Sequence, residues 1–138
     1  KHNHKDFDFD RPGKDSWRHR EAGAREVMVS SDRRWALMHE LRGAPEPKME
    51  ELLRHMSPVD LVLVEGFKRG DHPKLEVYRA SLGKTLLAPE DESIVAIASD
   101  APVAASTLPF FALSNVDAIA DFIIAHCRLE AVHGAAQR

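Results

Sequence analysis

Residues 58–70, PVDLVLVEGFKRG, decide the fold of this chain. Four consecutive apolar residues, 61–64, follow Pro58 and Asp60 and end at Glu65-Gly66. A short run that is apolar at every position predicts a strand buried on both faces, which is typical of the centre of a parallel sheet. We therefore expect a parallel sheet with residues 61–64 at its centre.

Other strand patterns lie on both sides of this run. Residues 94–98 (IVAIA) are continuously apolar, and residues 74–79 (KLEVYR) alternate as in a half-buried strand. A last short strand is predicted at 110–113. Upstream, residues 26–30 (EVMVS) and 34–41 (RWALMHEL) flank a short SDR turn and predict a hairpin.

Helix signals separate these strands. Asp15 is a capping residue for a helix through Ala24, and Pro47 favours the first position of a helix through about residue 55. Ser114 and Asp117 have capping-box spacing for a last helix. Helices between apolar strands predict an α/β fold, with a mainly parallel or mixed sheet flanked by helices, in one domain over residues 1–138.

The composition excludes several classes of protein. Hydrophobic residues are 43% and charged residues 30%, which is ordinary for a globular protein. Lys and Arg number 19 against 22 Asp and Glu, giving a net charge of −3, whereas nucleic-acid-binding domains usually have a pI above about 9. No stretch has the ~18 apolar residues of a membrane span. The single cysteine, Cys127, excludes an internal disulfide and suits a reducing cytoplasm.

Two strand ends are candidate ligand sites, because ligands of parallel sheets bind beyond the carboxyl ends of the strands. At the first, Glu65 resembles a Walker B acid that holds a Mg²⁺ shell or orients water, and Gly66 lets the backbone approach a phosphate. Alternatively, Glu65 only ends a strand in solvent. At the second, Asp100 has the position of a carboxylate that reads guanine, although it is equally consistent with a turn cap.

The opening segment, KHNHKDFDFDRPGKDS, is rich in charge and contains a Pro-Gly turn. Asp10, Lys14 and Asp15 around this turn resemble a loop that closes on a charged ligand. His2 and His4 are spaced to share a metal, but two histidines without cysteine make a poor zinc site, so a solvated loop is the alternative.

Residues 83–85, GKT, resemble the tail of a Walker A motif. That motif needs a glycine at position 78, which is Tyr, as well as a strand before it and a helix after it. We interpret the segment as a hairpin turn, and the 138 residues contain no P-loop.

Four blocks in this order resemble the molybdopterin-guanine dinucleotide biosynthesis adapters, the MobB family. They are residues 1–24 (with PGKDS and AGA), 34–41 (RWALMHEL), 58–79 (with VEGFK) and 94–102 (IVAIASDAP). The resemblance runs from Lys1 to about Phe122. It implies a P-loop GTP-binding protein of the α/β class that forms a homodimer and acts in molybdenum-cofactor synthesis. Such a protein uses GTP and Mg²⁺, hydrolyses GTP slowly and assists the guanylyltransferase MobA.

The resemblance also implies roles for individual residues. Glu65 corresponds to the Walker B acid, with Gly66 beside it. The loop Asp10–Ser16 corresponds to a switch-like segment near the γ-phosphate, in which we expect Asp10 beside the metal and Gly13, Lys14, Asp15 and Ser16 beside the nucleotide. Asp100 is the candidate for guanine recognition.

One part of the family pattern has no counterpart here. The family begins with a strand, a Walker A loop, a helix and a second strand, and residues 1–4 match only the end of that second strand. A chain of these residues alone is expected to bind GTP weakly or not at all and to expose the flank of residues 61–64. Two alternative functions stay open: a nickel-delivering metallochaperone of related fold that uses His2 and His4, and a non-enzymatic module that dimerises and docks partners.

Overall fold

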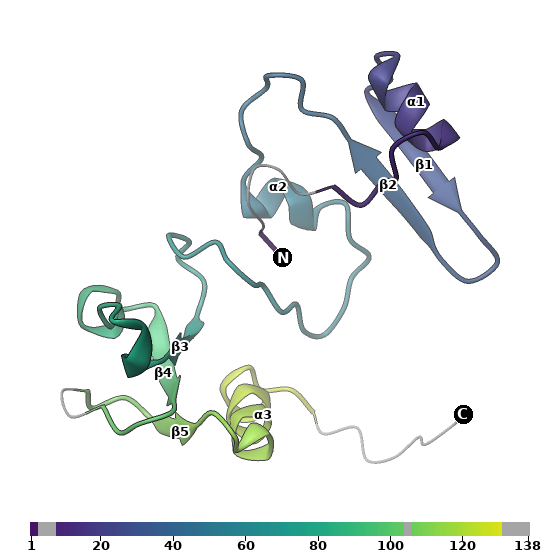
Figure 1. The fold of residues 1–138 in the computed structure, drawn as a ribbon. Coiled ribbons are helices and arrows are strands. Elements are labelled where there is room, and N and C mark those ends of the chain that lie inside the picture. Colours follow the sequence, from purple (N-terminus) through teal and green to yellow (C-terminus); the bar gives the residue numbers. More distant parts are fainter. Residues whose placement is uncertain (3–7, 104–105, 131–138) are drawn as a thin grey trace. The chain divides into compact units, whose positions relative to one another are not determined.

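The computed structural model describes residues 1–2, 8–103 and 106–130 (Figure 1). The chain divides into two compact units, one made of residues 1–58 with 64–67 and the other of residues 59–63 with those from 68 onward. Each unit contains its own sheet. The organisation of residues 1–138 as a single domain stays a prediction.

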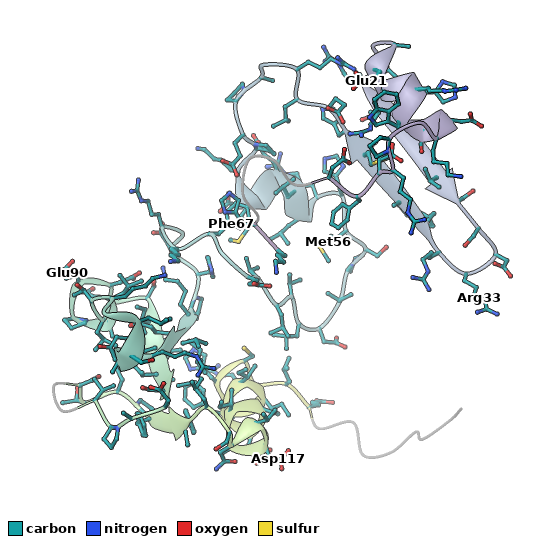
Figure 2. All side chains as sticks on the ribbon, in the orientation of Figure 1. Glu21, Arg33, Met56, Phe67, Glu90 and Asp117 are labelled. Carbon is teal, nitrogen blue, oxygen red and sulfur yellow. The ribbon has the colours of Figure 1, made fainter. Side chains whose placement is uncertain are left out.

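The first unit is built on the predicted hairpin. Strands β1 (Glu26–Ser30) and β2 (Trp35–His39) pair antiparallel, with Glu26 opposite His39 and Ser30 opposite Trp35. Helix α1 (Asp15–Glu21) packs against β1, and helix α2 (Met49–Leu53) follows the hairpin in sequence. Figure 2 labels Glu21 at the end of α1 and Arg33 in the loop that joins the two strands.

The two faces of the hairpin differ in burial. Val27 is buried, whereas Met28, Leu37 and Trp35 on the opposite face are 62%, 43% and 65% exposed. Because side chains alternate along a strand and the register pairs Met28 with Leu37, these three form one apolar row. The face that carries Val27 is only partly packed, since Val29 on that face is 48% exposed, and the other face presents the apolar row to solvent.

The second unit contains the parallel sheet. Strands β3 (Lys74–Tyr78), β4 (Ile94–Ser99) and β5 (Phe110–Ala112) run parallel in the order β3-β4-β5. The central strand β4 is almost entirely buried, as its continuous apolar run predicts. The α/β fold class, with a parallel sheet flanked by helices, is confirmed.

Helices contact both faces of this sheet. On one face, the ring of Phe122 from helix α3 (Val116–His126) lies 5.3 Å from the ring of Phe111. On the other face, Glu76 accepts hydrogen bonds of 2.8 Å from the backbone N–H groups of Leu87 and Ala88. These bonds hold the start of the short 3₁₀ helix η2 (Ala88–Glu90), which follows η1 (Ala80–Leu82) in the β3–β4 connection. No helix in the described ranges is long and apolar enough to span a membrane.

The prediction of a central strand at residues 61–64 is wrong in this structure. These residues form no strand, and Leu63 is 73% exposed. A buried strand needs hydrogen-bonded neighbours on both sides, and the described strands pair only as β1–β2 and β3–β4–β5. An apolar run therefore sets the tendency to form a strand, but the available pairing partners decide whether the strand forms.

Four local predictions also need correction. Helix α1 runs from Asp15 to Glu21 after Lys14, so Asp15 is its first residue instead of its cap, and the helix ends before Ala24. Helix α2 begins at Met49 after Lys48, so Pro47 precedes it instead of occupying its first position. The cap of α3 is Asn115, whose side chain accepts a hydrogen bond from the Ala118 N–H, and Ser114 lies outside the helix. Residues 83–85 do not turn a hairpin, because β3 and β4 are parallel, and Gly83 instead ends η1 with a φ of +61°.

An ion pair joins the starts of β3 and β4. Lys74 Nζ lies 2.9 Å from Asp91 Oδ2, and Ser93 also donates hydrogen bonds to Asp91. The Ser93 hydroxyl first, and then Lys74, lower the pKa of Asp91 from 3.8 to about 2. Because this pKa is lower in the folded state, the stabilisation is complete above pH 4 and disappears as the pH falls through about 2.

We predict that Asp91→Asn lowers the free energy of unfolding at pH 7 and weakens its dependence on pH between about 4 and 2. Urea unfolding at pH 7, 4 and 2.5 measures both effects. Glu92→Gln is the matched control, since Glu92 is the exposed neighbour of Asp91. Equal pH dependence in Asp91→Asn and wild type would contradict the assignment.

Candidate functional site

The Glu65-Gly66 turn is held by His2. The His2 N–H donates to the Glu65 carbonyl at 2.6 Å, so the start of the chain runs beside this turn. The His2 ring lies 5.0 Å from the ring of Phe67, which Figure 2 labels, and His2 Nε2 is 2.6 Å from Glu46 Oε1. His2 thus contacts the turn through its backbone and its ring, and also contacts the segment before α2.

Gly66 is required here for two independent reasons. Its φ of +91° is strained for residues with a side chain. A Cβ at this position would also lie 2.6 Å from His2 Cβ, closer than such atoms approach one another. The glycine therefore permits the close approach of two backbone segments.

The Glu65 carboxylate faces solvent beside this turn. Its side chain is 71% exposed, and Oε1 lies 3.1 Å from Lys1 Nζ. An exposed ion pair of this kind is weak, so the carboxylate can exchange its partner at little cost. Glu65 is available to a ligand.

Asp10 is bound in a network of hydrogen bonds. Its Oδ1 accepts from the Ser16 hydroxyl at 2.8 Å and from the Arg11 N–H at 2.9 Å, and its Oδ2 accepts from Arg20 Nε at 3.2 Å. A carboxylate offers about four acceptor positions, and three are used here. Asp10 and Ser16, both predicted ligand residues, are thus brought together to order the loop before α1.

Burial and hydrogen bonding shift the pKa values of the acids in this network in opposite directions. Burial of Asp10 raises its pKa, but the bonds from Ser16, Arg11 and Arg20 outweigh burial and leave the pKa below its ordinary value. The Asp10 N–H and then Arg20 lower the pKa of Asp8. Hydrogen bonds to Asp8 first and then to Glu40 raise the pKa of Arg20. The acids and the guanidinium therefore stabilise one another in their charged forms.

The remaining loop residues are exposed. Gly13 has a φ of +87° and lets the chain turn so that the Lys14 N–H reaches the Arg11 carbonyl at 3.2 Å. Lys14 immediately precedes α1, and Asp15 is the first residue of that helix. These three predicted nucleotide contacts lie at the surface on an ordered turn.

Asp100 belongs to the second unit. It follows β4 at the carboxyl edge of the parallel sheet, and its Oδ2 lies 3.9 Å from Nη1 of Arg79, which follows β3. The Ser99 hydroxyl accepts a hydrogen bond from the Ala101 N–H and shapes the turn that carries Asp100. Recognition of guanine by Asp100 stays a prediction.

The predicted metal ligands fit Mg²⁺ unequally. Glu65 is exposed and can offer oxygen atoms, whereas Asp10 would first have to release hydrogen bonds. Over the described ranges, no three residues of the types His, Cys, Asp and Glu converge to hold a metal. Mg²⁺ commonly needs only one or two carboxylates together with substrate phosphates, so Glu65 fits it and Asp10 fits poorly.

Sequence reasoning missed the partners that organise these segments. They are Arg20, Asp8 and Glu40 around Asp10, and Glu46 on His2. The alternating acids in FDFD favour a shared cation, which is Arg20. Arg20 and Glu40, however, are 20 residues apart, and no spacing rule connects them. His4, the second predicted metal histidine, lies outside the described residues.

Comparison with known proteins identifies the family. The model of the family described as "Molybdopterin guanine dinucleotide synthesis protein B" (MobB) matches residues 1–100, the part that carries Glu65, the Asp10 loop and Asp100. This chain belongs to the MobB family. The expected family resemblance is thereby confirmed.

Two relatives of this MobB chain are named "Molybdopterin-guanine dinucleotide biosynthesis adapter protein". The protein of Escherichia coli K12 is 38% identical over 130 residues, which cover 90% of this chain and 72% of the relative. The protein of Haemophilus influenzae is 39% identical over 127 residues, which cover 89% and 68%. The MobB chain thus has an adapter role in molybdopterin guanine dinucleotide biosynthesis.

We predict that Gly66→Ala is more destabilising than Gly43→Ala. Both glycines have similar φ, +91° and +86°, so both variants carry the cost of a left-handed residue, about 1–2 kcal/mol. Only Gly66→Ala adds a clash with His2, because nothing lies within 4 Å of a Cβ at Gly43. Urea unfolding of the two variants measures the difference, and equal destabilisation would show that His2 does not pack on Gly66.

Proposed function

We propose that this MobB chain is a GTP-binding adapter that assists the guanylyltransferase MobA in joining GMP to molybdopterin. In this proposal it acts in the cytoplasm as a homodimer and hydrolyses GTP slowly. The family membership and the names of the two relatives support the pathway and the adapter role. The proposal adds the nucleotide, the enzyme partner and the oligomeric state.

The observation that carries the proposal is the exposed Glu65 carboxylate beside the Gly66 turn. The turn is constrained by His2, while the carboxylate is held only by a weak ion pair with Lys1. A constrained backbone that presents an available acid suits a Mg²⁺-nucleotide ligand, in which the metal neutralises phosphate charge.

The residues have separate roles in this proposal. Glu65 holds or orients a water of the Mg²⁺ shell after Lys1 releases it. Gly13, Lys14 and Asp15 present the exposed turn near the phosphates, and Asp10 and Ser16 keep that turn ordered. For the second unit we propose separately that Asp100 accepts hydrogen bonds from the guanine N–H and amino groups, a pair of donors that adenine does not offer. This last role gives the preference for GTP over ATP.

We predict that Glu65→Gln lowers the rate of GTP hydrolysis by about 10- to 100-fold, as is typical when a group that orients a metal shell is removed. Binding of the guanylyltransferase should be unchanged, because the carboxylate acts on the nucleotide. Phosphate release measures turnover, and calorimetric titration measures binding of nucleotide and enzyme.

Glu50→Gln is the matched control, because Glu50 is an exposed acid of the same unit. Turnover that is unchanged in Glu65→Gln would refute the role of Glu65. Because residues 1–138 contain no P-loop, GTP binding is tested on a protein that also carries a Walker A segment, and absence of GTP binding by that protein would refute the nucleotide itself. Tight stoichiometric binding of Ni²⁺ that depends on His2 would favour a metallochaperone.

The apolar row on the hairpin supports the proposed homodimer. Met28, Leu37 and Trp35 lie on one face, and exposed apolar patches commonly mark protein interfaces. A two-stranded ribbon is also marginally stable by itself, so covering this face would stabilise it.

We predict that Leu37→Glu dissociates the dimer, since an uncompensated buried charge costs about 3–5 kcal/mol, or roughly a hundredfold or more in affinity. Leu52→Glu is the matched control, because Leu37 and Leu52 are 43% and 42% exposed. Sedimentation equilibrium measures the association. A monomeric wild type, or a Leu37→Glu variant that remains dimeric, would contradict this interface.

A further inference from the structure

Arg20 is the centre of a charged cluster that joins three parts of the first unit. Its side chain is only 14% exposed, and its nitrogen atoms lie 2.8 Å from Asp8 Oδ2, 3.2 Å from Asp10 Oδ2 and 2.9 Å from Glu40 Oε1. Asp8 and Asp10 precede the loop that begins at Arg11, Arg20 lies in α1, and Glu40 directly follows β2. One guanidinium thus binds a loop, a helix and the hairpin.

We infer that Arg20 is a positioning residue that fixes the loop Arg11–Lys14 for its ligand and couples that loop to the β1–β2 hairpin through Glu40. This inference rests on the proposed function for the identity of the ligand, Mg²⁺-GTP. It assigns Asp10 to the positioning network and leaves the exposed residues of the loop to contact the phosphates.

Asp10 joins both the loop and helix α1 to this network. Asp10 receives the Arg11 N–H and the Ser16 hydroxyl, so its carboxylate bridges the start of the loop and the first turn of α1. The Asp10 N–H in turn donates to Asp8 Oδ1 at 2.8 Å. Arg20 binds the carboxylates of both Asp8 and Asp10. A shift of its guanidinium is therefore expected to move Asp10 together with its contacts to the start of the loop and to the first turn of α1.

The hairpin has its own connections to the same cluster. Glu40 contacts Arg20 through its side chain, and its N–H donates to the Arg25 carbonyl just before β1. Arg42, two residues further on, donates to the carbonyls of Arg20 and Ala24 at the end of α1. The end of β2 is consequently tied to both the side chain and the backbone of Arg20.

A lysine cannot replace this arginine. The planar guanidinium directs its N–H groups along fixed, separate directions, and the three carboxylates lie on Nε, Nη1 and Nη2. An ammonium group keeps the charge but not this geometry. Arg20→Lys therefore separates positioning from simple charge balance.

Coupling between the loop and the hairpin has a reciprocal consequence. A ligand that orders the loop changes the affinity of the hairpin for its partner by some factor. A partner bound to the hairpin then changes the affinity of the loop for its ligand by the same factor. The apolar row on the hairpin and the nucleotide are thereby linked through one residue.

We predict that Glu40→Ala weakens Mg²⁺-GTP binding roughly tenfold, within the 5- to 150-fold range of coupled sites. In the ligand-free protein, amide hydrogen exchange at residues 10–16 should accelerate to a similar extent. Glu26→Ala is the matched control, because Glu26 lies on the same hairpin but pairs with His39 instead of Arg20. Calorimetric titration gives the affinity, and mass spectrometry gives the exchange.

The outcomes distinguish the inference from its alternatives. If Glu40→Ala lowers the unfolding temperature but leaves the GTP affinity unchanged, the positioning role of Arg20 is overturned, and the Arg20–Glu40 ion pair only stabilises the fold. Full GTP affinity and normal hydrogen exchange in Arg20→Lys would overturn the role of the guanidinium geometry. Because Arg20→Lys retains Glu40, it also tests the inference should Glu40→Ala fail to fold. A protein that carries a Walker A segment and still binds no GTP would overturn the proposed function alone, because the exchange comparison still decides whether the cluster orders the loop.

Discussion

The shared guanidinium of Arg20 is the interaction on which the first unit depends. This unit has few buried apolar side chains in the described ranges, with Val27 as the buried residue of the hairpin. Its loop, helix and hairpin are instead connected by charge-assisted hydrogen bonds, which are about twice as strong as neutral ones. Directional bonds of this kind fix the conformation of a small unit more sharply than a small apolar core does. The same bonds determine which loop side chains remain free for a ligand.

The second unit is organised in the opposite way, by burial of a strand. Ile94, Ala96, Ile97 and Ala98 in β4 are buried, so β3 and β5 pair on its two edges and helical segments contact both faces. Polar side chains act mainly at the margins of this sheet. Lys74 and Asp91 join the starts of β3 and β4, and Arg79 and Asp100 lie at its carboxyl edge. The candidate guanine-recognition residue therefore follows the most buried strand of its unit.

Most elements were predictable because they are encoded locally. The hairpin, the strands β3, β4 and β5 and the helices agree with the sequence patterns to within a few residues. The run 61–64 was not predictable, since an apolar run forms a strand only where neighbours supply hydrogen bonds. In the candidate site, the glycine of the Glu65-Gly66 turn was expected to admit a phosphate, and the structure shows it admitting His2. Arg20, Glu40 and Glu46 escaped prediction because each meets partners distant in the chain.

The sequence by itself determined the family, the α/β class and the residues that can carry chemistry, because motifs, periodicity and residue type are all local properties. Only the tertiary structure decided how those residues are used. It placed Asp10 and Ser16 in one hydrogen-bond network and left Glu65 exposed beside a constrained turn. The physical reason is that a carboxylate has a limited number of acceptor positions. Which donors occupy them depends on segments that folding brings together, and those segments are far apart in the sequence.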